Sequence, residues 1–216
     1  TTPMSANNKT GRTNAEVAKQ VTAVKTASGE VNKKANNVNN SMKAATANVR
    51  EGHVMSATRH LQTGANNAGK AISELSRAIN NAQKVKASPN ATPQQQESAA
   101  KEVAGAAKEV ANVSKVVSNT VKTVVNAAVA SNAHQMSASE RLNLNNAKQH
   151  VTQSNKHAQQ AENASKNAHK AAINGNLSRA IAAAEVVQEA TETAMEHALP
   201  AVSNVRSAVK NCNNKH

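Results

Sequence analysis

Apolar residues recur along most of this chain at alternating steps of three and four, and this spacing restricts its fold more than any other feature. Between residues 13 and 50 the repeat runs unbroken for about five heptads, and only Ser28 places a polar side chain in it. Such a stripe lies on one side of an α-helix and is typical of helices that pack side by side along their length. The stripe consists of Val17, Val21, Val24, Ser28, Val31, Ala35, Val38, Met42, Ala45 and Val49.

The middle of the chain shows the repeat most clearly, as AAKEVAG, AAKEVAN, VSKVVSN and TVKTVVN over residues 99–126. One heptad position holds Val103, Val110, Val117 and Val124, and another holds Lys101, Lys108, Lys115 and Lys122. With the valines facing the seam, the lysines fall at the outermost position of the helix. The four lysines are a candidate basic face, although such a column is more often a solvated surface than a binding site.

Capping and turn signals divide the repeat into separate helices. Thr13 to Glu16, Thr92 to Gln95 and Ser137 to Glu140 have the form of capping boxes, and Gly52, Pro89 and Gly175 mark turns. Pro200 is expected to kink or break the last helix. The predicted order is a flexible arm (1–12), a single bundle (13–211) with helices at about 13–50, 53–87, 93–133, 138–173 and 177–211, and a polar tail (212–216).

Composition and turn length together predict the architecture. The chain has no Phe, Tyr or Trp, and Ala is its most frequent residue, so the seams must be narrow and built from Ala and Val. Short connections make consecutive helices antiparallel neighbours. The predicted fold is all-α, an elongated antiparallel up-and-down bundle of four to five long helices. The alternative is an extended coiled coil that assembles with other chains.

The sequence shows no catalytic or metal-binding pattern. His150 and His157 are seven residues apart, as are His53 and His60, which is too far along one helix for two side chains to share an ion. The chain has no Asp, and its Ser and Thr residues do not stand in a nucleophile motif. The stripe formed by Glu185, Glu189, Glu192 and Glu196 is predicted to be a solvated face. We therefore expect no enzyme activity, no cofactor, no metal and no small-molecule substrate.

The charge of the chain indicates the kind of partner. A formal net charge of +13 and a pI near 10.1 favour attraction to anionic partners, although charge also keeps a helical surface solvated. Single-stranded nucleic acid is usually bound by stacking its bases on aromatic side chains, which this chain lacks. Binding of nucleic acid, if any, is therefore expected to be non-specific and directed at phosphates.

The single cysteine, Cys212, cannot form a disulfide within the chain, so an intermolecular disulfide is its candidate role. No apolar stretch approaches the length of a membrane span. The chain begins with Thr1 in place of Met, and we interpret it as a secreted protein.

These features lead to three hypotheses about function. The first is a non-enzymatic structural or interaction protein that self-associates or binds anionic partners. The second is a lipid-binding or surface-active bundle that opens at interfaces. The third is a sequence-independent binder of polyanions such as nucleic acid or glycans. In composition and heptad pattern the chain resembles insect apolipophorin-III bundles and the Ala-rich coiled-coil silks of bees and ants, without a shared motif.

Overall fold

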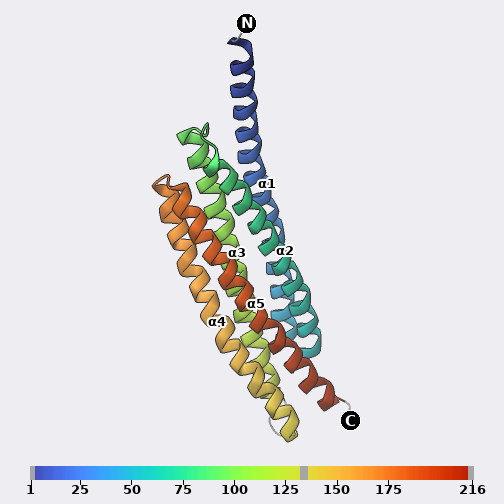
Figure 1. Ribbon diagram of the computed structural model, residues 1–216. Helices are drawn as coiled ribbons and strands as arrows, with labels where there is room; N and C mark the ends of the chain where they lie inside the picture. The colour runs from blue at the N-terminus through green and yellow to red at the C-terminus, as the bar shows by residue number, and fades with distance from the viewer. Residues whose placement is uncertain (1–2, 132–135, 214–216) are drawn as a thin grey trace.

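The computed structural model confirms an all-α bundle (Figure 1). It describes the backbone of residues 3–131 and 136–213 and the side chains of residues 14–131 and 136–210. Consecutive helices are antiparallel, so the chain runs up and down along one elongated bundle. Within the described residues the helices are α1 (Pro3–Arg50), α2 (Val54–Ala87), α3 (Pro93–Ser131), α4 (Ala138–Ile173) and α5 (Leu177–Asn213).

The third helix is the centre of the bundle. α3 contacts each of the other four helices, with the α1–α2 hairpin on one side and the α4–α5 hairpin on the other. α2 also contacts α5, whereas in the described part of the chain α1 contacts neither α4 nor α5. The seams are therefore filled within one chain, which is the first of the two arrangements that the heptads allow.

The predicted seams are buried along all five helices. Every side chain that the heptad pattern assigns to a seam is buried except Val49, which is partly buried against the core. Burying a valine or leucine contributes about 1.5–3 kcal/mol, whereas each alanine contributes little, so stability must accumulate over the whole length of the seams.

The helix ends follow the local signals in the sequence. Gly52 and Gly175 have φ of 80° and 65°, a left-handed conformation that glycine adopts without steric cost. At the start of α3, Thr92 Oγ1 accepts from the Gln95 amide at 3.1 Å and Gln95 Oε1 accepts from the Thr92 amide at 2.9 Å. Ser137 and Glu140 form the same reciprocal pair at the start of α4. These four boundaries agree with the predicted ones.

Two helix ends differ from the predictions, at the start of α1 and the end of α5. α1 begins at Pro3, well before the predicted start at residue 13, because proline is favoured in the first turn and nothing after it stops a helix. The side chains of residues 1–13 lie outside the described residues, so the flexibility of the predicted arm stays a prediction. α5 is one helix through Pro200, so the predicted break is absent, while the predicted kink stays a prediction. The helix ends at Asn213, so the predicted tail begins inside it.

Candidate anion-binding site

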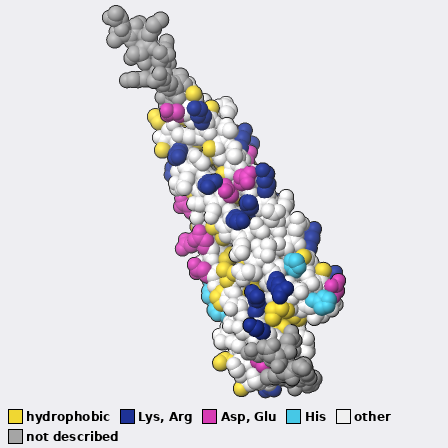
Figure 2. Space-filling model, turned by 90° about the vertical axis from the view of Figure 1, so that its right-hand side faces the viewer, with side chains coloured by type: hydrophobic (Ala, Val, Ile, Leu, Met, Phe, Trp, Pro, Cys, Tyr) yellow, Lys and Arg dark blue, Asp and Glu magenta, His cyan; other side chains and the backbone are white. Residues whose placement is uncertain are grey.

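A groove between the start of α2 and the end of α5 gathers three cationic side chains. It has a volume of about 490 Å³. We call it the α2–α5 groove, and it is lined by Met55, Arg59, Gln62, Ser203, Arg206, Ser207 and Lys210. Figure 2, which shows the bundle from the right-hand side of Figure 1, has several Lys and Arg side chains gathered around a small apolar patch.

Helical spacing explains why these side chains face one another. On α2 the lining residues follow at steps of four and three, and on α5 Ser203, Arg206, Ser207 and Lys210 occupy one face over two turns. The residues between them, such as Val205 and Val209, are buried in the seam. Packing of α2 against α5 therefore places two polar faces opposite each other at one end of the bundle.

The three cations of the groove have no acidic partner among the described residues. Neither arginine nor Lys210 forms an ion pair with a described glutamate, and no glutamate lines the groove. Guanidinium groups can bind the oxygens of a sulfate, phosphate or carboxylate in pairs, and serine hydroxyls and the Gln62 amide can add hydrogen bonds. The α2–α5 groove thus has the chemistry of an anion site.

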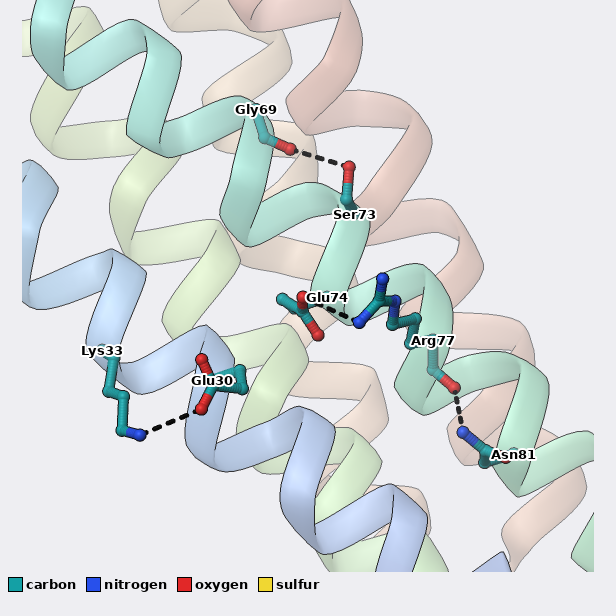
Figure 3. Close-up of polar contacts among 7 residues, drawn as sticks. All are labelled: Glu30, Lys33, Gly69, Ser73, Glu74, Arg77 and Asn81. Atoms are coloured by element: carbon teal, nitrogen blue, oxygen red, sulfur yellow. Dashed lines mark hydrogen bonds and ion pairs between the residues drawn. The ribbon is translucent and has the colours of Figure 1, made fainter.

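Elsewhere, several cations are already engaged by nearby glutamates. On the first hairpin, Lys33 contacts Glu30 at 2.9 Å and Arg77 contacts Glu74 at 3.3 Å, each within its own helix (Figure 3). The hydrogen bond and charge of Lys33 lower the pKa of the Glu30 carboxyl below its usual value. These pairs are exposed or nearly so, and such pairs contribute little to stability.

The predicted basic face on α3 is exposed but spread out. All four lysines of the column point to solvent, while the valine column is buried, as the heptads predict. Successive lysines are about 10 Å apart along the helix. Lys101 pairs with Glu97 at 2.8 Å and Lys115 with Glu162 of α4 at 3.5 Å. The column therefore does not converge on one ligand as the groove does.

The remaining predicted features do not meet at a site. The four glutamates of α5 are exposed, as expected, and Glu185 accepts a hydrogen bond from Gln83 of α2 at 2.7 Å. The side chain of Cys212 lies outside the described residues, so its role as an intermolecular disulfide stays a prediction. Within those residues no group of three or more His, Cys or acidic side chains is placed to hold a metal ion.

Sequence reasoning missed one cluster altogether. His150 and His157 are two turns apart on α4, but His197 of α5 lies against both. The Nδ1 atoms of His150 and His197 are 3.2 Å apart, and the rings of His157 and His197 stack with centroids 5.9 Å apart. Spacing along one helix cannot reveal a partner on another helix, so these residues gave no signal.

The groove was also missed, although a weak signal existed. In an up-and-down bundle the start of the second helix and the end of the fifth lie at the same end, and Arg206 and Lys210 are spaced to share a face. What the sequence did not indicate is that α2 and α5 are neighbours.

Comparisons of the chain with family models, with curated proteins and with solved structures find no match. No helix in the described part of the chain combines the length and apolar character needed to cross a membrane.

Proposed function

We propose that this protein is a non-enzymatic binding protein that holds a linear polyanion through its charged groups, with the α2–α5 groove as the main contact. The observation that carries this proposal is the convergence of Arg59, Arg206 and Lys210 on one groove without acidic partners among the described residues. The net charge of +13 adds a long-range attraction that raises the association rate.

The composition restricts the mode of recognition. The chain has no Phe, Tyr or Trp, the side chains that most often stack on bases and sugar rings, so we expect a partner to be held mainly by its sulfate or phosphate groups. Such binding is sensitive to salt, because each neutralised phosphate releases counterions. A polyanion extending beyond the groove would next meet the other exposed lysines of the surface.

The test compares two variants that each remove three positive charges. One carries Arg59→Gln, Arg206→Gln and Lys210→Gln, and the matched control carries Lys108→Gln, Lys122→Gln and Lys156→Gln, whose lysines are exposed and form no ion pair with described residues. Binding to a heparin oligosaccharide and to duplex DNA is measured by calorimetry over a range of salt concentrations.

The groove variant should lose most of its affinity, and the slope of log K against log salt for DNA should fall by about three, about one for each lost contact. The control variant should keep most of its affinity and most of its salt slope. Equal losses in the two variants would show attraction by net charge alone and would contradict a site in the groove.

A second candidate function is the surface-active one, and the two glycine turns favour it. Gly52 and Gly175 lie in short turns that could act as hinges between helices with narrow Ala and Val seams. Uncharged vesicles separate the two proposals, because they attract an opening bundle but not an anion site. Binding to zwitterionic vesicles that is as strong as binding to heparin would favour the second candidate.

A further inference from the structure

The α4–α5 hairpin carries a feature that polyanion binding does not use, namely the histidine pair formed by His150 and His197. We propose that these two imidazoles bind a divalent transition-metal ion, of the class of Zn²⁺, Ni²⁺ and Cu²⁺, through their Nδ1 atoms. Both residues are half-buried and line an open groove of about 520 Å³, so an ion can reach them from solvent.

The distance between the two nitrogens fits one shared ion. Two ligand nitrogens that each lie about 2.0–2.1 Å from a metal, at a cis or tetrahedral angle, are about 2.8–3.4 Å apart. His150 Nδ1 and His197 Nδ1 are 3.2 Å apart, and imidazole nitrogen is a ligand that these metals prefer. The separation of the two nitrogens therefore allows both to bind one ion.

The surroundings suit a site of mixed protein and water ligands. The groove is also lined by Asn146, Gln149, Gln153 and Asn204, whose amide oxygens can bind the ion or its water molecules, and no Lys or Arg lines it. His157 stacks against His197 and has its Nδ1 2.8 Å from Gln160 Oε1, which supports the orientation of the rings. Only two imidazoles are supplied, so the remaining positions on the ion are open.

An ion at this position would join α4 to α5. Because the ion binds the folded hairpin, it should raise the melting temperature as its concentration rises. At a hundredfold excess over its Kd the expected rise is roughly 5–11 °C for a chain of this size. Acid should abolish the effect, since protonated imidazole cannot bind a metal.

The experiment uses the full chain with Cys212→Ser, which removes the thiol as a competing ligand. Titration with Zn²⁺ and with Ni²⁺ is followed by calorimetry and by ¹H–¹⁵N spectra of the histidine side chains. We expect one ion per chain, with shifts at the nitrogens of His150 and His197. His150→Ala and His197→Ala should each abolish binding, whereas the control His169→Gln should leave it unchanged.

A gain-of-function variant keeps the test decisive if either alanine variant unfolds. Gln153 lines the same groove three residues after His150, so Gln153→His should supply a third imidazole and tighten binding by about tenfold or more. The proposal is overturned if the Cys212→Ser chain binds no ion, if binding survives His197→Ala, or if Gln153→His has no effect on affinity.

Discussion

The two hairpins on either side of α3 share one heptad geometry but fill their seams differently. The α1–α2 hairpin buries large side chains, among them Met42, Leu61, Ile72 and Leu75. The α4–α5 hairpin also buries Leu144, Leu177, Ile181 and Met195, but most of its buried apolar residues are alanine, and Ser154 and Thr191 lie in its buried seam. The first hairpin therefore buries more valine and the second more alanine, so the helices of the second must approach each other more closely.

Close approach allows polar contacts to cross between helices. Ser154 donates to the backbone carbonyl of Ala194 on α5 at 2.9 Å, and its oxygen is 2.6 Å from Ser118 Oγ on α3. The histidine pair adds a further contact on the same hairpin. A polar group in an apolar seam fixes the register of its neighbours, because a shifted helix would leave the group unpaired. In this hairpin the alanine seam lets the helices approach closely, and the polar contacts then fix their register.

The largest expected effect is in the apolar hairpin. Leu75 is fully buried, so Leu75→Ala should lower the free energy of unfolding by about 2–5 kcal/mol through lost burial and the cavity left behind. Leu142→Ala is the matched control, because Leu142 is 60% exposed, and it should change stability by less than about 0.5 kcal/mol. Urea unfolding measures both, and equal costs would contradict the assignment of the core.

A smaller effect is expected in the polar seam. Ser154→Ala should cost about 1–2 kcal/mol, because Ser118 loses its partner and the contact with the Ala194 carbonyl disappears. Ser114 is equally buried, but its hydroxyl has no hydrogen-bond partner, so Ser114→Ala should be neutral or stabilising. The same unfolding assay distinguishes the two. A loss with Ser114→Ala as large as with Ser154→Ala would show that alignment does not depend on the hydrogen bonds.

Glycines test close approach in the first hairpin. A Cβ atom at Gly64 would overlap the methyl group of buried Met42 on α1, whereas one at Gly69 meets no neighbouring atom. Gly69→Ala should therefore stabilise the protein by about 0.5–1 kcal/mol, the ordinary gain in helix propensity. Gly64→Ala should give no such gain or should destabilise the protein, because the new methyl group overlaps Met42. Thermal melts of the two variants give the comparison, and an equal gain in both would mean that α1 and α2 are not in contact there.

The smallest effect concerns exposed ion pairs. The hydrogen bond and the charge of Lys101 lower the pKa of the Glu97 carboxyl from its usual value of 4.5. Because the folded pKa is the lower one, the contribution of this pair to stability is present above the unfolded pKa and is lost as the pH falls through the folded pKa. Lys101→Gln should raise the pKa of Glu97 in an NMR titration, while the pKa of Glu30 beside Lys33 stays lowered. An unchanged Glu97 pKa would contradict the pairing.

Much of the fold could be predicted because its signals are local. The heptad stripes determine which side of each helix is buried, and the capping boxes at Thr92 and Ser137 determine where two helices begin. The predicted start of α1 at residue 13 was wrong, because the capping-box pattern from Thr13 to Glu16 lies inside a continuous helix.

The lateral order of the helices could not be predicted, and both proposed sites depend on it. A heptad stripe shows that a helix has a buried side, but it does not say which helix covers that side. The central position of α3 had one overlooked signal, because Val121 and Val125 add buried positions outside its main stripe. The contacts between α2 and α5, and between His150 and His197, have no such signal.

Amide hydrogen exchange, followed by mass spectrometry with and without a heparin oligosaccharide, tests the central claim that a closed bundle binds a polyanion through the α2–α5 groove. We predict slower exchange in the first turns of α2 and the last turns of α5, with no change in the seam between α4 and α5. Faster exchange throughout α4 and α5 would mean that the bundle opens to bind. Slower exchange confined to α3 would place the contact on the lysine column, and either result would contradict the claim.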